Sequence, residues 1–229
     1  MNHFVLPSVG VDREKFIIEE CTNKRVLHLG CADWPFTEGR IQDGTWLHYK
    51  LSTVARTCLG VDDHGESVVS LSNDYGINNI IVGDAERLGE LDIGKFEVVV
   101  AGEIIEHLNN PGLLFESVKN VLEEDGKLLI TTINAYCLRR FVRIPFGRES
   151  VHPDHVYYFS HSTLMTLATR FGFILEGAYS YKINNRKPYL PYVVERLATM
   201  ITPNWGEGIV HLYSNRSTPT TQVSRPMLG

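Results

Sequence analysis

Residues 96–111 read FEVVVAGEIIEHLNNP, and this stretch decides the fold. Its first six residues form an apolar run rich in β-branched side chains, which is typical of a strand buried on both faces of a sheet. Asn110 and Pro111 then favour a helix start, because asparagine caps helices well and proline fits the first helical turn. A buried strand that leads through a polar segment into a helix is one unit of a parallel α/β sheet.

The chain on either side repeats this unit. Further apolar runs predict strands at 26–29, 58–61, 79–82, 127–133, 173–180 and 209–213. Segments between them predict helices at 11–21, 38–56, 66–75, 111–122, 162–171 and 192–200. We therefore expect an α/β fold with a doubly wound, Rossmann-like, mostly parallel seven-stranded sheet, helices on both faces and an antiparallel last strand.

The composition fits one compact domain. Of the 229 residues, 43% are hydrophobic and 21% are charged, which are ordinary globular values. We expect a single domain over residues 1–213 and a disordered polar tail at 214–229. No apolar run is long enough to span a bilayer, and the first residues lack a signal-peptide pattern. The four cysteines lack the paired spacing of zinc or disulfide frameworks, which predicts reduced thiols and a cytoplasmic protein.

Three of the predicted strands are followed within two residues by an acidic residue, namely Asp62, Asp84 and Glu103. Ligands of open parallel sheets bind beyond the carboxyl ends of the strands, so these side chains should lie near one pocket. Gly30, after the strand at 26–29, would let the backbone approach a ligand closely. Carboxylates in these places can accept hydrogen bonds from a ribose diol and an adenine amino group, which together describe an adenosine pocket.

Over about residues 24–180 the chain resembles the class I S-adenosylmethionine-dependent methyltransferases. The resemblance rests on the order and spacing of five segments: VLHLGCAD (26–33), LGVDD (59–63), GDAERL (83–88), FEVVVAGEIIEHLNNP (96–111) and GKLLITTINAY (126–136). It implies S-adenosylmethionine as methyl donor and S-adenosylhomocysteine as product. The cofactor contacts that it implies are Gly30, Ala32, Asp62, Asp84, Ala85 and Glu103.

The first of these segments departs from the family pattern. His28 stands where the family has an acid, and only Gly30 remains of three glycines, with Ala32 and Trp34 at the other two places. Alanine fits where φ is negative, whereas Trp34 must reshape the loop. A non-catalytic protein with a degenerate fold therefore stays an alternative. A dinucleotide-binding oxidoreductase fits less well, because its G-x-G-x-x-G pattern is absent.

Glu103, Glu106 and His107 have the spacing i, i+3 and i+4, which places them on one side of a helical turn if the backbone is helical there. Two carboxylates and an imidazole repel or share a proton unless a cation joins them, and such donors suit Mg²⁺ or another divalent cation. Without a metal, Glu106 would pair with His107 or cap the turn.

This E-x-x-E-H segment resembles that of the ubiquinone-biosynthesis O-methyltransferases. It is also similar to that of the small-RNA terminal 2′-O-methyltransferases, where it binds a divalent metal. Both groups have a further histidine downstream, which implies His155 as a fourth ligand besides Glu103, Glu106 and His107. His107 and His155 are also the candidate catalytic bases, because imidazole titrates near neutral pH.

The charge is divided unevenly along the chain. Residues 1–133 hold 11 basic and 22 acidic residues, whereas residues 134–229 hold 11 and 5. The basic part begins at 134–160, which we expect to be a substrate-lid insertion. Its candidate substrate residues are Arg139, Arg140, Arg143, Arg148 and Tyr157. Arginines suit phosphate or carboxylate groups and aromatic rings suit a sugar face, but an amphipathic helix with solvated arginines is equally consistent.

The sequence thus predicts an enzyme that methylates an oxygen of a small or glycan-type, anionic metabolite. An RNA 2′-O-methyltransferase is the alternative, but an isoelectric point of about 6.0 is low for a nucleic-acid binder. The oligomeric state stays open.

Overall fold

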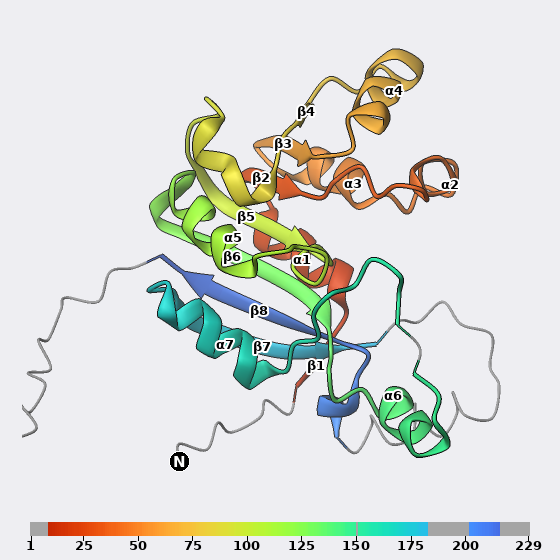
Figure 1. The fold of residues 1–229 in the computed structure, drawn as a ribbon. Helices are drawn as coiled ribbons and strands as arrows, with labels where there is room; N and C mark the ends of the chain where they lie inside the picture. Colours follow the sequence, from red (N-terminus) through yellow and green to blue (C-terminus); the bar gives the residue numbers. More distant parts are fainter. Residues whose placement is uncertain (1–8, 150, 183–201, 216–229) are drawn as a thin grey trace, which may run out of the picture.

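The computed structural model describes residues 9–149, 151–182 and 202–215 (Figure 1). The predicted helix at 192–200 and the predicted tail beyond residue 215 lie outside these ranges. None of the four cysteines, all of which lie in the described ranges, forms a disulfide, while the cytoplasmic location stays a prediction. No helix in the described part of the chain is long and apolar enough to cross a bilayer.

The described strands form one open mixed sheet in the order β1-β7-β8-β6-β5-β2-β3-β4. They are β1 (Gly10–Val11), β2 (Arg25–Leu29), β3 (Thr57–Asp62), β4 (Ile80–Val82), β5 (Phe96–Gly102), β6 (Leu122–Ile133), β7 (Ile174–Tyr181) and β8 (Gly208–Ser214). The last strand, β8, runs antiparallel to both of its neighbours, as predicted. The expected strand number was one too low, because two-residue β1 is too short for a hydrophobic pattern to reveal it.

Helices cover both faces of this sheet (Figure 1). They are α1 (Arg13–Cys21), α2 (Thr37–Gln42), α3 (Leu47–Val54), α4 (Gly65–Tyr75), α5 (Pro111–Lys119), α6 (Leu138–Arg143) and α7 (His161–Arg170), with short 3₁₀ turns η1 (Ala85–Glu90), η2 (Ile144–Phe146) and η3 (Pro203–Trp205). The prediction of one helix over 38–56 was wrong: the chain leaves the helix after α2 and turns at Gly44, whose φ of 65° suits glycine.

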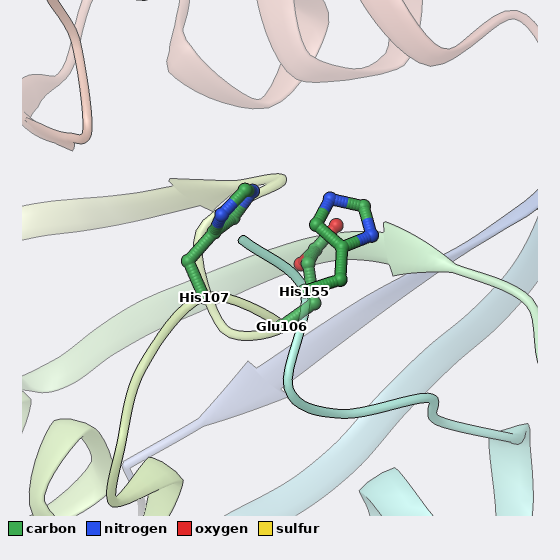
Figure 2. Close-up of side chains that lie close together, drawn as sticks. All are labelled: Glu106, His107 and His155. Carbon is green, nitrogen blue, oxygen red and sulfur yellow. The ribbon is translucent and has the colours of Figure 1, made fainter. Parts of the chain in front are cut away.

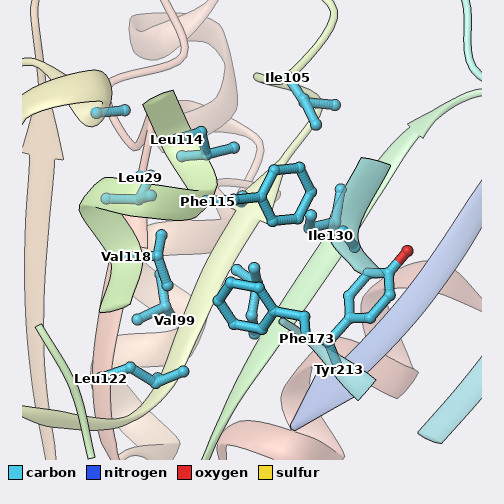
Figure 3. Close-up of a cluster of buried hydrophobic side chains, with 14 of the residues drawn as sticks. Leu29, Val99, Ile105, Leu114, Phe115, Val118, Leu122, Ile130, Phe173 and Tyr213 are labelled. Carbon is cyan, nitrogen blue, oxygen red and sulfur yellow. The ribbon is translucent and has the colours of Figure 1, made fainter. Parts of the chain in front are cut away.

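Strand β5 shows how the two faces are filled. Val99 and Ala101 pack on the side of η1, α5 and α7, where Phe115 is fully buried (Figure 3). Val98 and Val100 pack on the opposite side, against α1 and α3. Because successive strand residues point to opposite faces, the continuous apolar run of β5 is what a doubly covered central strand requires.

The strand order reverses between β2 and β5. From β2 the chain continues outward to β3 and β4, whereas from β5 it continues to β6 on the other side. In open α/β sheets, ligands bind where the strand order reverses, in a crevice beyond the carboxyl ends of the strands.

Candidate functional site

A cavity of about 570 Å³ opens at the carboxyl ends of β2, β3 and β5. This volume lies in the usual range for small-molecule sites. Five of the six predicted cofactor residues line it: Gly30, Asp62, Asp84, Ala85 and Glu103. The sixth, Ala32, does not line the cavity.

Asp62, at the end of β3, is held in place from two sides. Its carboxylate accepts hydrogen bonds from the backbone N–H groups of Ala32 (2.8 Å) and His64 (3.0 Å). Burial raises the pKa of the Asp62 carboxyl, and these two N–H groups only partly offset the effect. The contribution of Ala32 is therefore its backbone N–H, which fixes the acid that faces the cavity.

The loop after β2 brings Gly30 and Trp34 to the cavity. Gly30 has a φ of 66°, and a Cβ atom there would lie 3.2 Å from the Ile104 side chain, so glycine is needed. The Trp34 ring stacks on His64, with centroids 4.6 Å apart and planes at 17°. Both rings line the cavity, so tryptophan in place of the family's glycine has become part of its wall.

His28, the residue in place of the family's acid, also lines the cavity although it is almost fully buried. Its Nδ1 atom lies 3.3 Å from Nδ1 of His48. Burial, followed by the neighbouring His48, lowers the pKa of His28 well below its ordinary value. Position 28 therefore carries a neutral ring and supplies no negative charge.

Glu106, His107 and His155 form a second group at the same end of the sheet. Their candidate ligand atoms all lie within 4.8 Å of one another. Figure 2 shows Glu106 and His107 on the loop after β5, with His155 reaching them from a separate segment. The rings of His107 and His155 meet edge to face, with centroids 4.5 Å apart. Both histidines line the cavity.

Main-chain hydrogen bonds hold the two halves of this group together. The carbonyl oxygen of Glu106 accepts the N–H groups of Val156 (2.9 Å) and Tyr157 (3.3 Å), directly after His155. The N–H of His107 donates to the carbonyl of Ile104 and closes the turn after β5 (2.9 Å). The position of His155 beside His107 is thus set by the backbone.

The protonation of this group follows from its burial. Glu106 is fully buried, and burial, with Glu103 as the next cause, raises its pKa to about 8. One of its oxygens accepts the Thr132 hydroxyl (2.8 Å), while Oε1 has no hydrogen-bond partner among the described residues. Burial also lowers the pKa of His155 to about 4 and that of His107 below its ordinary value, so both rings are neutral near pH 7.

Glu103 does not join this group, so the expectation that one helical turn places all three E-x-x-E-H side chains together was wrong. Glu103 has a φ of 57°, in the left-handed region, and the chain therefore leaves β5 in a tight turn. Its carboxylate instead accepts a hydrogen bond from the Tyr181 hydroxyl at the end of β7.

The predicted substrate residues of 134–160 do not line the cavity. Arg139 forms an ion pair with Glu207 (3.1 Å), and Arg140 lies over the Tyr158 ring. Tyr157 donates its hydroxyl to the carbonyl of Asn109 (3.2 Å). Of the two remaining residues, Arg143 is half-buried and Arg148 is exposed.

The cavity-lining residues that the sequence did not single out include Arg13, His152 and Asp154. The His152 ring lies 5.0 Å from that of His155 and 6.0 Å from that of His107. His152 could have been found from the sequence, because it lies three residues before His155. No local pattern marks Arg13, which reaches the cavity from α1.

Residues 15–176 match the family model described as a methyltransferase domain. A ubiquinone biosynthesis O-methyltransferase of Glaesserella parasuis is 40% identical over 131 residues, which are 56% of this chain and 52% of that protein. The mitochondrial ubiquinone biosynthesis O-methyltransferase of Rattus norvegicus is 26% identical over 55% of this chain and 35% of that protein. The chain thus spans about half or less of the length of these relatives.

Solved structures show the same architecture. A SAM-dependent methyltransferase from Archaeoglobus fulgidus matches 88% of this chain and 91% of its own, with a TM-score of 0.57 and 16% identity. One from Aquifex aeolicus matches 88% and 89%, with a TM-score of 0.54 and 12% identity. The chain therefore belongs to the methyltransferase domain family and has the fold of the S-adenosylmethionine-dependent methyltransferases.

Proposed function

We propose that the protein transfers the methyl group of S-adenosylmethionine to an oxygen of a small or glycan-type, anionic acceptor. The observation that carries this proposal is that one cavity is lined both by the acids after β3 and β4 and by the neutral imidazoles of His107 and His155. The proposed pocket for the methyl donor and a group able to take a proton therefore lie in the same cavity.

The cavity suits the adenosine part of the cofactor. Each oxygen of Asp62 accepts one backbone N–H and keeps a lone pair, so the carboxylate can still accept both hydroxyls of a ribose. Asp84 follows β4 in the place suited to an adenine amino group, and Ala85 beside it leaves room for the ring. The left-handed backbone at Gly30 lets the chain approach the ligand without a Cβ atom.

Methyl transfer is a displacement in line with the bond that breaks. When bound, the cofactor supplies an electrophilic methyl group on a sulfonium centre. This chain must align the acceptor oxygen and remove its proton. Neutral His107 is the residue that we propose as the base, with His155 against its ring. The relatives named as O-methyltransferases support oxygen as the acceptor atom.

Glu106, His107 and His155 also suit a divalent cation. The buried Oε1 of Glu106, which has no hydrogen-bond partner among the described residues, and the two neutral imidazoles can serve as ligand atoms for a cation. Because Glu103 points elsewhere, this set has two nitrogens for one carboxylate, which favours Mn²⁺ or Fe²⁺ over Mg²⁺. With a cation bound, His107 would be its ligand and not the base, and the cation would instead lower the pKa of an acceptor hydroxyl.

The anionic character of the acceptor rests on the net charge of +6 over residues 134–229, which follow β6. The RNA alternative is disfavoured by the isoelectric point of about 6.0, which is low for a nucleic-acid binder.

Label transfer tests the proposal. Methyl-labelled S-adenosylmethionine and the protein are incubated with a metabolite extract, and labelled products are identified by mass spectrometry. We expect an O-methylated product with a carboxylate or phosphate group. Neutral acceptors that react equally fast would refute the anionic class. Full activity after EDTA treatment, with no metal retained on the protein, would refute the metal. Absence of S-adenosylhomocysteine binding by calorimetry would favour the non-catalytic alternative.

A further inference from the structure

Helix α6 and turn η2 lie in an arm, residues 138–148, that leaves much of its apolar surface open to solvent. Every residue of α6 and η2 is half-buried or exposed. Phe146 and Phe141 are 76% and 70% exposed, more than any other large hydrophobic side chain in the described part of the chain. Val142 and Ile144 between them are exposed as well. Because monomeric soluble proteins rarely expose several neighbouring apolar side chains, such a patch indicates contact with a partner or a membrane.

The root of the arm is fastened to the segment that leads into β8. Asn134 donates its side-chain amide to the carbonyl groups of Asn204 (2.8 Å) and Gly206 (2.9 Å). Arg139 forms the ion pair with Glu207 described above. Figure 1 shows α6 beyond the end of the sheet, next to the short blue turn η3. The arm is therefore held where it begins, and its most exposed side chains lie further along it.

The arm is also strongly basic. Residues 134–148 contain four arginines and no acidic residue. Two of the arginines, Arg139 and Arg140, contact the rest of the domain. Arg143 and Arg148 form no ion pair within the described ranges. Two guanidinium groups therefore stand among exposed apolar side chains, with their charge available to an anionic partner.

This mixture of side chains fits an anionic lipid surface. Phenyl and branched aliphatic groups suit the boundary between lipid headgroups and acyl chains, and arginines suit the phosphates of the headgroups. Tyr136 and Trp205, beside the root of the arm, are 64% and 43% exposed. Tyrosine and tryptophan are the residues that gather at this boundary in membrane proteins.

Other partners fit the arm less well. Pairing the arms of two copies of this chain would place four arginines against four. An extended nucleic acid would also meet the rest of the molecule, where residues 1–133 hold 22 acidic and only 11 basic residues. The aliphatic side chains of Val142 and Ile144 offer no stacking face to a base. A lipid surface touches the arm alone and meets neither objection.

We propose that residues 138–148 dock the protein onto the surface of an anionic phospholipid bilayer. The side chains that enter the boundary between headgroups and acyl chains are Phe141, Val142, Ile144 and Phe146. Arg143 and Arg148 bind lipid phosphates. The arm lies on the bilayer and does not cross it, since α6 has six residues and a span needs about twenty. This docking is independent of the proposed methyl transfer.

Cosedimentation of the full chain with vesicles tests the proposal. The vesicles are made of phosphatidylcholine alone or of an equimolar mixture of phosphatidylcholine and phosphatidylglycerol. The two arm variants are Phe141→Ser/Phe146→Ser and Arg143→Gln/Arg148→Gln. The matched controls, which remove exposed side chains elsewhere, are Tyr49→Ser/Val69→Ser and Lys15→Gln/Arg170→Gln. Urea unfolding checks that each variant is folded.

We expect wild type to partition about tenfold or more in favour of the mixed vesicles over phosphatidylcholine, and less strongly at high salt. Arg143→Gln/Arg148→Gln should weaken binding to the mixed vesicles about tenfold or more, because each basic residue near an anionic surface contributes about fivefold. Phe141→Ser/Phe146→Ser should also remove the binding that remains at high salt, because salt does not screen apolar contacts. Both control variants should bind as wild type does.

Phe146→Trp distinguishes insertion of the arm from adsorption by charge alone. Lipids that are brominated on their acyl chains quench tryptophan fluorescence only at close contact. The fluorescence that Phe146→Trp adds to wild type should therefore be quenched in mixed vesicles. Tyr49→Trp, a similar change at an exposed position of α3, should add fluorescence that is not quenched.

Several results would overturn the docking. Equal partitioning of wild type into both kinds of vesicle, or into neither, would refute the anionic lipid surface. A loss of binding in the control variants as large as in the arm variants would refute the role of the arm. If vesicles are not bound and the arm variants instead abolish self-association or binding of single-stranded RNA, the arm serves that partner and the proposal is wrong. Label transfer without vesicles tests the methyl-transfer proposal separately.

Discussion

Buried neutral histidines should make this fold sensitive to mild acid. His161 and His211 are buried and form a chain of hydrogen bonds with Tyr213. His161 Nδ1 lies 2.7 Å from His211 Nε2, and His211 Nδ1 lies 2.6 Å from the Tyr213 hydroxyl. His48 is buried on the other face. Burial lowers the pKa of His161 and His48 to about 4, and burial together with His161 lowers that of His211 to about 3.

The size of the effect follows from the difference between folded and unfolded states. A folded pKa below the unfolded value of 6.5 means that the stability from the neutral ring is complete above pH 6.5 and is lost as pH falls toward 4. Each group loses about 1.4 kcal/mol per pH unit, hence about 2 kcal/mol by pH 5. Three such groups give about 4–6 kcal/mol. Buried Glu106, whose pKa is raised to about 8, acts in the opposite direction and offsets about 2 kcal/mol of this loss. The net loss of about 2–4 kcal/mol is still a substantial part of a typical total of about 5–15 kcal/mol.

Urea unfolding followed by circular dichroism at pH 8, 7, 6 and 5 measures this loss. We expect a fall in the free energy of unfolding below pH 6.5, and a smaller fall as pH rises from 7 to 8, because buried Glu106 with its pKa of about 8 loses its proton there. Glutamine in His211→Gln can still form hydrogen bonds with His161 and Tyr213 but does not titrate. The number of protons taken up on unfolding, which sets the slope of the free energy of unfolding against pH, should therefore fall by about one. A free energy of unfolding that differs by less than about 1 kcal/mol between pH 7 and pH 5 would refute the reasoning.

Three further outcomes are expected from single substitutions. His107→Ala should lower kcat about 10²-fold or more while S-adenosylhomocysteine affinity, measured by calorimetry, stays within about threefold; equal losses of both would make His107 structural. Asp62→Asn should weaken S-adenosylhomocysteine and 5′-methylthioadenosine binding alike, about tenfold in calorimetry, because both ligands contain the ribose; a loss limited to one ligand would contradict the ribose assignment. Gly30→Ala should destabilise the fold by about 1–2 kcal/mol in urea unfolding, because its φ of 66° is left-handed; unchanged stability would show that the loop adapts.

The fold could be predicted from the sequence because its strands are long apolar runs with polar ends. The run that became β5 has no polar residue among Val98–Ala101, and Asn110 accepts the N–H of Gly112 as a helix cap should. Two features escaped. The break between α2 and α3 depends on a single left-handed glycine, and β1 is defined by its pairing with β7 rather than by its own residues.

The site was predicted as far as local sequence determines it. Asp62 and Asp84 lie at strand ends, where the strand itself carries them to the cavity. Glu103 also lies at the cavity, as its place after a strand predicts. Its grouping with Glu106 and His107 rested on a helical spacing, which did not apply because the backbone at Glu103 is left-handed. Arg13 depends on contacts with Thr131 and Tyr181, more than 100 residues away, which no spacing encodes.

The two hydrogen bonds from Val156 and Tyr157 to the carbonyl of Glu106 have a consequence for protein engineering. They join main chain to main chain, so they do not depend on which side chains stand at positions 156 and 157. The segment that carries His155 can therefore change its sequence extensively while the imidazole keeps its place beside His107. The segment before His155 can therefore be replaced in engineered variants without moving this imidazole away from His107.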